Sequence, residues 1–528
     1  MKKTLSLFLA LMLTLLVCLP ASAAVTAKGE LPIVDEPITL TIALPVAAKV
    51  EDMATNKLTL WYEEQTGIQL KFIELSPEDV ATQVNMLMNS SDLPDVVLGY
   101  DVPYDVLCGY ADAGLIVPLD EQYEKYGLYV YERLIPEMGE ATLGYVTYDD
   151  QLWAVPAGGN LITNLYGSEY NRIQTQFLEA LGMEMPRTLD ELYAFLVGVR
   201  DNDVNGNGDP SDEIPMTTYA RTNFVFRMIS NAYQYTDCGT YLKVNDGKVS
   251  FIANNELFKE ALTFMKKLID EGLCDPACFT QDESVCATIL AQEGNNVGIY
   301  ACGNTYTNSM DSEGDEYQNM RCLPNLAGPY GYKSTLYSPS GVRRTGIVTS
   351  ACENVDAAFR FLDFCLSEEA GIATRVGFEG EQWKVADEGV IGRDGKQAKF
   401  SLLTTQEWVQ PSTNVIWDME SFIVSSVMNG CEAAQTAAKY PINMDIIEWN
   451  YEGEVTNERL PQLMMDADTT LEYNELQGII RTAVEEAIAT FVLGDRDLAE
   501  FDDYCAELEK MGLQQYIDMA QAAYDELM

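Results

Sequence analysis

The sequence predicts an α/β protein with more than one lobe and a helical C-terminus. Between residues 38 and 98, and again after residue 156, stretches with the apolar alternation of strands are followed by stretches with helical periodicity. Such a succession of strands and helices is typical of lobes with a largely parallel sheet. The 528 residues allow roughly two to four domains at the usual domain size.

The first lobe is predicted to start with three strands and two helices. The strands are 38–44, 68–72 and 96–98, and the helices are 58–64 and 80–88. Ser76 and Pro77 favour a helix start just before the second helix, because Ser is a common N-cap and Pro suits the first helical position. The polar leader at residues 24–36 is expected to be mobile.

The second lobe is expected to begin after Trp153–Pro156. Thr188 and Glu191 form a capping box that opens a helix ending near Arg200. Asn245–Lys248, flanked by alternating apolar residues, predicts a β-hairpin. The other predicted elements are helices ending at Leu181 and spanning 256–271 and 355–366, and a strand at 297–300.

The C-terminal region predicts two or three helices. One apolar face is formed by Ile480, Val484, Ala487 and Phe491. Gly494 and Gly512 are placed where these helices would end, because glycine is common just past a helix C-terminus.

The charge balance excludes several functions. The chain has 33 Lys and Arg residues against 82 Asp and Glu residues, which gives a net charge of −49. Such a surface repels the phosphates of nucleic acids and of anionic membranes, so nucleic-acid binding is not expected. The chain has no histidine, which excludes histidine-based catalytic triads and histidine-ligated zinc.

The N-terminus predicts export. Lys2 and Lys3 precede an apolar stretch at Leu5–Leu19, and Ala21-Ser22-Ala23 is a typical cleavage signal, so we expect residues 1–23 to be removed. Lipidation at Cys18 is not favoured, because Val17 stands where a lipobox has a small residue. The protein is therefore expected outside the cytoplasm, at the cell surface or in the periplasm.

The cysteines are spread along the chain. Twelve are present and eleven remain after cleavage, an odd number that leaves at least one thiol unpaired within the chain. Cys274 and Cys278 are close enough in sequence to form a local bridge, although pairs with this spacing are usually unbridged. The remaining cysteines are interpreted as small buried apolar residues.

A loop between residues 201 and 213 has the pattern of a calcium site. Oxygen-bearing side chains occur at alternate positions, with glycines where the loop must turn, and Ca²⁺ needs six to eight oxygen ligands. Two registers fit the EF-hand rule, one starting at Asp201 with Gly206 at the turn and one at Asp203 with Gly208. The alternative is a solvated loop of Asx-turns.

Tryptophans in turn-like contexts suggest a sugar site. Trp153 precedes Ala-Val-Pro, Trp383 follows Glu-Gly-Glu-Gln, and Trp417 lies within Val-Ile-Trp-Asp. Flat aromatic faces suit the apolar faces of sugar rings. The alternative for each of them is a core position, which is the commoner environment of a single tryptophan.

No catalytic motif is found. The nucleophile elbow Gly-x-Ser-x-Gly, the Walker loop and Gly-x-Gly-x-x-Gly are absent. Paired carboxylates can hydrolyse glycosides, but the abundance of acidic residues makes any chosen pair uninformative. The sequence gives no positive case for an enzyme.

Several short segments occur in an order that is typical of one family. The most specific is 178–215, which contains LGMEMPRTLDEL and DVNGNGDPSDEIP. The others are 85–97, 113–120, 150–156, 268–276, 378–383 and 491–524. From about Ile38 to the C-terminus the chain resembles family 1 of the extracellular solute-binding proteins of carbohydrate ABC transporters. Within it, the chain is similar to the large calcium-containing branch with the alginate-oligosaccharide binders.

This resemblance implies a two-lobed fold like that of the type II periplasmic binding proteins. Hinge strands would join two α/β lobes around a ligand cleft, and the C-terminus would add helices. The first lobe would take residues 36–152 and 322–376. The second would take 153–321, while 377–528 would supply the hinge, the rest of the second lobe and its helical extension.

The resemblance also implies a function without catalysis. The protein would capture an extracellular oligosaccharide in the cleft and deliver it to the permease of an ABC importer, and we expect it to be a monomer. A structural Ca²⁺ would lie outside the cleft in the Asp203 register. Its ligands would be Asp203, Asn205, Asn207, Asp212 and Glu213, with a backbone oxygen near Asp209.

Five residues are predicted to face the ligand: Trp383, Glu381, Trp417, Trp153 and Tyr100. The turn before Trp383 should lie at the hinge. Tyr100 follows a buried strand, at the carboxyl end where open α/β sheets bind ligands.

A neutral oligosaccharide is favoured, because the mature chain would carry 31 basic and 82 acidic residues, a charge of −51. An acidic sugar would need a basic pocket, which Arg343, Arg344 and Arg375 could supply. The rival hypotheses are a peptide-binding transport receptor, a secreted glycoside hydrolase and a calcium-dependent adhesin.

Overall fold

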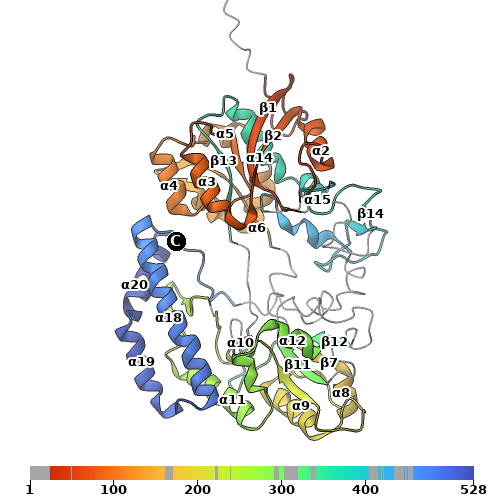
Figure 1. Ribbon diagram of the computed structural model, residues 1–528, viewed down its shortest axis with the longest axis vertical. Coiled ribbons are helices and arrows are strands. Elements are labelled where there is room, and N and C mark those ends of the chain that lie inside the picture. Colours follow the sequence, from red (N-terminus) through yellow and green to blue (C-terminus); the bar gives the residue numbers. More distant parts are fainter. Residues whose placement is uncertain are drawn as a thin grey trace, which may run out of the picture.

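Two lobes form the molecule and lie above one another along its long axis, with the C-terminal helices beside the second lobe (Figure 1). The computed structural model describes residues 24–48, 50–160, 171–219, 224–237, 239–290, 296–301, 319–334, 341–403, 414–417, 419, 421–432, 445, 449 and 456–527. The predicted signal peptide at residues 1–23, with Cys18 and the cleavage site, lies outside these ranges. The two-lobed α/β architecture agrees with the prediction, whereas both main sheets are mixed rather than largely parallel.

The first lobe contains a five-stranded sheet in the order β2-β1-β3-β13-β6. Its strands are β1 (Ile38–Pro45), β2 (Ile68–Leu75), β3 (Val96–Leu98), β6 (Val155–Ala157) and β13 (Arg343–Val348). β1 pairs in parallel with β2 and β3, whereas β13 runs antiparallel to β3 and β6. Ile42 and Ala43 of β1 join two different apolar clusters, because successive side chains of a strand point to opposite faces.

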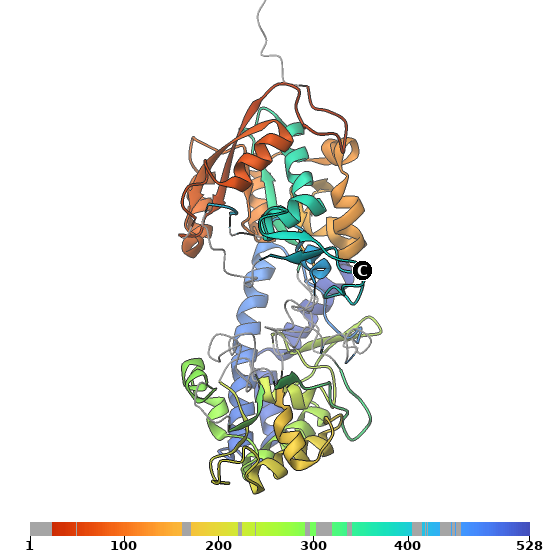
Figure 2. The ribbon, with the colours of Figure 1, turned by 90° about the vertical axis from the view of Figure 1, so that its right-hand side faces the viewer.

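Helices surround this sheet (Figure 2). They are α2 (Lys57–Thr66), α3 (Val80–Met88), α4 (Tyr104–Asp112), α5 (Asp120–Tyr126), α6 (Ile135–Met138), α14 (Val355–Cys365) and α15 (Glu368–Arg375). Two small hairpins, β4 (Thr147–Tyr148) with β5 (Gln151–Leu152) and β14 (Trp383–Val385) with β15 (Phe400–Leu402), complete the described strands here.

The second lobe has a four-stranded sheet in the order β12-β7-β11-β8. Its strands are β7 (Asn171–Gln174), β8 (Ile214–Thr217), β11 (Val297–Ala301) and β12 (Met320–Cys322), and a separate hairpin joins β9 (Leu242–Asn245) to β10 (Lys248–Phe251). The helices here are α8 (Thr175–Leu181), α9 (Leu189–Asp201), α10 (Phe224–Ser230), α11 (Glu256–Asp270) and α12 (Glu283–Leu290). β11 is parallel to β8 and antiparallel to β7.

Three C-terminal helices complete the second lobe: α18 (Ala467–Leu493), α19 (Phe501–Lys510) and α20 (Leu513–Leu527). The predicted apolar face of α18 is buried in the core of this lobe, with Val484 and Phe491 fully inaccessible. Gly494 ends α18 in the left-handed conformation, as its position predicts. α18 also contacts α4, so it touches both lobes.

The predicted hairpin turn is confirmed, and the predicted capping box is confirmed in its Thr188 half. The Thr188 hydroxyl caps α9 by accepting a hydrogen bond from the Glu191 backbone N–H at 3.2 Å. In a full capping box the Glu191 carboxylate would accept a bond from the backbone N–H of Thr188. Here it accepts that bond from the backbone N–H of Arg187 instead. In the β9–β10 hairpin, Asp246 and Gly247 both have positive φ, as a two-residue type I′ turn requires.

The predicted lobe boundaries differ from the packing at two places. A boundary at residue 152 would separate β6 from the first-lobe sheet, although β6 pairs there with β13. Residues 377–432 were expected in the hinge and second lobe, but their described part packs on the first lobe. Trp417 and Phe422, for example, belong to its main apolar cluster. Both differences arise because strand pairing and core contacts join segments that are far apart in the sequence.

The leader at residues 24–36 is held in place rather than mobile. The buried Arg360 of α14 donates hydrogen bonds to the carbonyl oxygens of Thr26, Ala27 and Glu30, at 2.6 to 2.7 Å. Ile33 and Val34 are buried in the first-lobe core. A guanidinium group can satisfy several carbonyls at once, so one arginine from the distant helix α14 fixes the leader.

Asp363 lies one helical turn beyond Arg360, and its buried carboxylate holds the backbone at residues 128–130. It accepts hydrogen bonds from the backbone N–H groups of Leu128, Tyr129 and Val130, at 3.0 to 3.3 Å. Burial disfavours the charged carboxylate more strongly than these bonds and the nearby Arg360 favour it. The pKa of Asp363 is therefore raised to about 6.

We predict that this carboxylate makes stability depend on pH. With a folded pKa above the unfolded value of 3.8, the native state binds more protons than the unfolded state between about pH 4 and 6. The free energy of unfolding should therefore fall as the pH rises through this range, on the order of 3 kcal/mol from this group. Urea unfolding at several pH values measures the fall, and Asp363→Asn should reduce it. An equal pH dependence in both proteins would contradict the assignment.

Candidate functional site

The carboxyl ends of the parallel strands in both sheets point into the space between the lobes. The chain passes from the end of β6 to the start of β7, and from the end of β12 to the start of β13. β6 runs parallel to β3, and β12 runs parallel to β11 and β8, so both crossings link one carboxyl edge to the other. Open α/β sheets bind ligands at this edge.

A cavity of about 600 Å³ lies between the lobes. The first lobe contributes Asp101, which follows β3, and Arg343, which begins β13. The second lobe contributes Asp237 and Tyr473, among others. The remaining described lining residues are Thr240, Gly341, Val342, Arg459, Leu460, Pro461, Gln462, Leu463, Met465, Thr470 and Asn474.

This interlobe cavity is polar and of mixed charge. The Asp101 carboxylate accepts a hydrogen bond from the Arg344 N–H at 2.8 Å, and the Asp237 carboxylate accepts bonds from the Gly239 N–H and the Thr240 hydroxyl. Arg343 and Arg459 are the two arginines among the described residues that line this cavity. Carboxylates, guanidinium groups and amides together can bind the hydroxyl groups of a neutral polar ligand.

Residues 459–466, which we call the crossing segment, contact both lobes. Just before it, the Glu458 carbonyl accepts a hydrogen bond from the Val244 N–H in the second lobe at 2.8 Å. Within it, the Gln462 carbonyl accepts a bond from the Tyr145 hydroxyl of the first lobe at 3.0 Å. A change in the angle between the lobes must therefore move this segment, which lines the cavity.

Two of the predicted ligand-binding tryptophans lie in the core, which corrects the prediction. Trp417 is 1% exposed, packs on Tyr62 and Phe72, and donates its indole N–H to the Thr59 hydroxyl. Trp153 is 8% exposed and donates to the Tyr148 carbonyl. Both rings satisfy their polar group within the first lobe, as buried tryptophans usually do.

Strand β14, which begins at Trp383, lies at the lower edge of the first lobe (Figure 1). Neither Trp383 nor Glu381 is among the described residues that line the interlobe cavity. Trp383 is half-buried at the start of β14, donates its N–H to the Gly377 carbonyl and meets Phe400 edge to face. The indole is thus fixed in orientation. Glu381 is exposed and forms an ion pair with Lys57 at 2.5 Å.

Tyr100 lies directly before Asp101, at the carboxyl end of β3 as predicted. It is half-buried, and its side chain packs against an apolar cluster of the first lobe. Its burial and the neighbouring carboxylates of Asp101 and Asp105 raise the pKa of its hydroxyl, which therefore stays a neutral donor.

The basic residues named from the sequence differ in position. Arg344 is buried and donates to the Tyr145 carbonyl at 2.7 Å, so its side chain supports the first lobe. Arg343, one residue earlier in the strand, lines the cavity. Asp237 and the crossing segment were missed by the sequence analysis, because neither carries a local motif that marks a ligand site.

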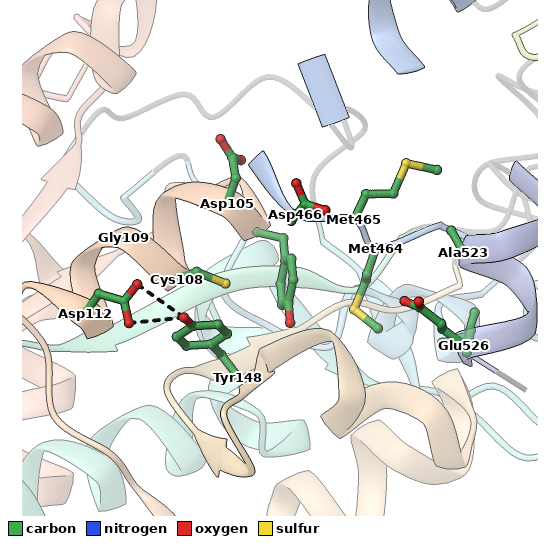
Figure 3. A pocket seen from close by; sticks show the side chains of 12 residues that line it. Asp105, Cys108, Gly109, Asp112, Tyr148, Met464, Met465, Asp466, Ala523 and Glu526 are labelled. Atoms are coloured by element: carbon green, nitrogen blue, oxygen red, sulfur yellow. Dashed lines mark hydrogen bonds between the residues drawn. The ribbon is translucent and has the colours of Figure 1, made fainter. Parts of the chain in front are cut away.

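A second cavity, of about 570 Å³, lies between α4 of the first lobe and the end of α20 (Figure 3). Asp105 and Asp112 face it from α4, while Asp466 and Glu526 face it from the C-terminal part. The Asp112 carboxylate accepts a hydrogen bond from the Tyr148 hydroxyl at 3.1 Å. No Lys or Arg occurs among the described residues that line this cavity, so it repels anionic ligands.

The loop at residues 203–213 has the Asp203 register. Asp203 accepts a hydrogen bond from the Gly208 N–H at 2.9 Å, and Glu213 accepts one from the Val204 N–H at 2.9 Å. Asp201 instead ends α9 and pairs with Arg200, outside the loop. Gly206 and Gly208 both have positive φ, 75° and 92°, so the glycine conformations fit either register and the hydrogen bond from Gly208 to Asp203 favours the second.

Oxygen atoms of this loop lack partners. One carboxylate oxygen each of Asp203, Asp212 and Glu213 is buried without a hydrogen bond. Asn207 donates its amide to the Asp212 carboxylate at 2.7 Å, and Asp209 bonds to Ser211. Within the described part of the chain, no three Asp, Glu or Cys side chains lie in an arrangement that could hold a metal ion. The donor set of carboxylates and amides nevertheless fits Ca²⁺.

Comparison with known proteins agrees with this architecture. The chain matches the bacterial extracellular solute-binding protein family over residues 43–372. It is similar to the fructooligosaccharide ABC transporter substrate-binding protein FusA of Streptococcus pneumoniae serotype 4, with 26% identity over 483 residues, which cover 88% of this chain and 86% of FusA.

No helix in the described ranges is long and apolar enough to cross a membrane.

Solved structures share the fold. An HMO-binding, ABC-transporter-associated solute-binding protein from Bifidobacterium longum infantis has a TM-score of 0.72 and 18% identity, and covers 93% of this chain and 99% of its own. An S. pneumoniae FusA EF-hand mutant in complex with fructo-nystose has a TM-score of 0.66, 21% identity and coverages of 92% and 99%. The alginate-binding protein AlgQ2 without calcium ion has a TM-score of 0.60, 20% identity and coverages of 93% and 98%.

The family match extends over more than half of the chain, and the solved structures reproduce both lobes. The resemblance inferred from the order of the sequence segments is therefore confirmed. This chain belongs to the bacterial extracellular solute-binding protein family.

Proposed function

We propose that the protein is the substrate-binding component of an ABC importer and captures a neutral oligosaccharide between its lobes. The observation that supports this proposal most directly is the interlobe cavity at the facing carboxyl edges of the two sheets. Residues from both lobes line this cavity, and together they supply carboxylates, guanidinium groups and amides. A ligand held there contacts both lobes at once. The relatives whose names specify a sugar, FusA and the HMO-binding protein, support an oligosaccharide as the ligand.

Ligand capture in this proposal works by closure of the lobes. Contacts on both sides of the cavity favour the closed arrangement, and the chain crossings act as hinges. The crossing segment follows this motion because it is bonded to Tyr145 on one side and adjoins Glu458 on the other. The closed form would be the one that a membrane permease recognises. The protein would act as an exported monomer after loss of residues 1–23.

Trp383 is our proposed stacking residue. Its N–H is occupied by the Gly377 carbonyl, so the group that remains for a ligand is the ring face. A fixed flat ring suits the apolar face of a sugar and loses little entropy on binding. Glu381, two residues before Trp383, and Tyr100, which precedes the cavity residue Asp101, would bind hydroxyl groups.

We further propose that the loop at residues 203–213 holds a structural Ca²⁺. The buried, unpartnered oxygens of Asp203, Asp212 and Glu213 support it, because such atoms are costly unless a cation or a donor satisfies them. Asn205 and Asn207 would supply amide oxygens, and the chain near Asp209 a backbone oxygen. Asn207 would have to turn its amide, since its nitrogen faces Asp212. The EF-hand of FusA and the description of the AlgQ2 structure as a form without calcium ion support this site by analogy.

The first prediction of this proposal concerns Trp383. Trp383→Ala should weaken the binding of the matching oligosaccharide by about 2 kcal/mol or more, roughly thirtyfold in Kd, because a rigid aromatic contact is lost. Isothermal calorimetry measures Kd, after a thermal-shift screen of neutral oligosaccharides that includes kestose has identified the ligand.

Two variants serve as controls for this measurement. Glu381→Gln should weaken binding less, because an amide still accepts hydroxyl hydrogen bonds. Trp417→Phe should lower Tm and leave Kd nearly unchanged, since Trp417 lies in the core. Affinity of Trp383→Ala within twofold of wild type would remove Trp383 from the site. Turnover of the sugar would favour a glycoside hydrolase, and shifts with peptides alone would favour a peptide receptor.

The second prediction concerns calcium. Chelation should lower Tm, because an ion bound by the folded state adds about 2.7 kcal/mol at a hundredfold excess over Kd. Asp203→Ala combined with Asp212→Ala should abolish this gain and affect sugar affinity much less, since the loop lies outside the interlobe cavity.

Asp201→Asn is the matched control, because Asp201 pairs with Arg200 and is excluded from the loop in the Asp203 register. This variant should keep the full response to calcium. Differential scanning calorimetry with and without chelator measures all three proteins. An unchanged Tm of the wild type on chelation would exclude the site.

A further inference from the structure

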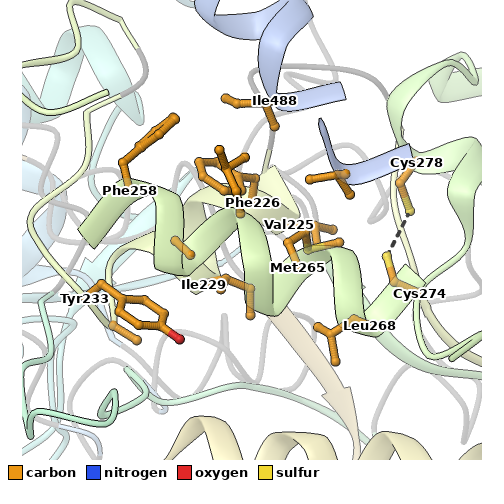
Figure 4. Close-up of a cluster of buried hydrophobic side chains, with 14 of the residues drawn as sticks. Val225, Phe226, Ile229, Tyr233, Phe258, Met265, Leu268, Cys274, Cys278 and Ile488 are labelled. Atoms are coloured by element: carbon orange, nitrogen blue, oxygen red, sulfur yellow. Dashed lines mark hydrogen bonds between the residues drawn. The ribbon is translucent and has the colours of Figure 1, made fainter. Parts of the chain in front are cut away.

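Two cysteines of the second lobe hold their sulfur atoms next to each other. The Sγ atoms of Cys274 and Cys278 lie 3.7 Å apart (Figure 4). Cys274 follows the end of α11, and Cys278 lies in the short 3-10 helix at Pro276–Phe279. Neither the calcium loop nor the interlobe cavity uses these thiols.

The surroundings of this pair are apolar. Cys274 is 1% exposed and Cys278 4% exposed, and both belong to the core of the second lobe, near Met265 and Leu268 of α11. Burial raises the pKa of the Cys274 thiol well above its ordinary value. Because both sulfurs are buried, reaction of the pair with a reagent in solution requires local opening of the segment.

The backbone around the pair is anchored independently of the sulfurs. The Cys274 N–H donates to the Leu268 carbonyl, and the Cys278 N–H donates to the Asp275 carbonyl at 3.0 Å. Asp275 in turn donates its N–H to the Met216 carbonyl of β8 at 2.9 Å and accepts a bond from the Thr217 hydroxyl at 3.3 Å. With the backbone held by these bonds, closing the sulfurs to the ~2.05 Å of a disulfide would have to come from side-chain rotation.

We propose that Cys274 and Cys278 form a reversible disulfide, a redox site in the second lobe. The thiolate of one cysteine attacks a sulfur of an external disulfide, either a small disulfide or that of a thiol oxidoreductase, and releases one thiol. The second cysteine loses its proton and attacks the mixed disulfide, which forms the Cys274–Cys278 bond and releases the second thiol. The two protein thiols are oxidised and one external disulfide is reduced to two thiols.

The position of this site gives the bond a structural consequence. β8 begins directly after Glu213 of the calcium loop and ends at Thr217, which lies 4.0 Å from the Cys278 sulfur. The disulfide would fasten the segment that holds the end of β8, at the sheet edge that faces the interlobe space. An exported protein meets oxidising conditions in which such a bond persists.

The test is disulfide mapping of the folded protein. Native protein is incubated with oxidised glutathione and then denatured in the presence of iodoacetamide, which alkylates the free thiols. The protein is digested and the peptides are analysed by mass spectrometry. We expect one peptide in which Cys274 and Cys278 are unalkylated and two hydrogen atoms are missing, and full alkylation of both after dithiothreitol. Cys278→Ser is the matched variant and should lose this species, with Cys274 alkylated or carrying glutathione.

Mapping of the wild type alone is decisive if the variant fails to fold. Alkylation of both cysteines after oxidation would overturn the proposal. So would a disulfide that joins Cys274 to another cysteine, such as Cys286, in place of Cys278.

Discussion

The direction in which the chain crosses between the lobes is the constraint on which the site depends. Each described crossing joins the carboxyl edge of one sheet to the carboxyl edge of the other, so these edges must face each other. Loops at such edges carry the ligand-binding residues of open α/β sheets. Asp101 and Arg343 therefore come from distant parts of the chain and still share one cavity with Asp237 and Tyr473. In the proposed mechanism, these crossings act as the hinges between the lobes.

The charge of the lining residues determines which ligands the interlobe cavity can bind. The whole chain carries a net charge of −49, and the second cavity presents four carboxylates from both lobes. Only the cavity at the carboxyl edges, among the two interlobe cavities described, adds guanidinium groups to its carboxylates. Mixed charge of this kind suits a ligand rich in hydroxyl groups, whose hydrogen bonds need both donors and acceptors. The proposed preference for a neutral oligosaccharide rests on this difference between the two cavities.

Features with a local signal were predictable from the sequence, and features made by distant contacts were not. Thr188 caps α9 and Asp246-Gly247 turns the hairpin as predicted, because the cause of each lies within a few residues. The loop at residues 203–213 carries a local pattern, and the hydrogen bond from the Gly208 N–H to Asp203 agrees with the Asp203 register. Trp417 was misplaced because its neighbours Tyr62 and Phe72 come from the other end of the chain. The anchoring of the leader by Arg360 and the role of residues 459–466 have no local pattern and required the structure.

The central claim is that an oligosaccharide closes the two lobes over the interlobe cavity. Small-angle X-ray scattering of the calcium-loaded protein, with and without the oligosaccharide that gives the largest thermal shift, tests it most directly. The account predicts a smaller radius of gyration with ligand, and no change with a sugar that gives no thermal shift. Saturating binding with an unchanged radius of gyration would contradict closure and place the ligand on a single lobe.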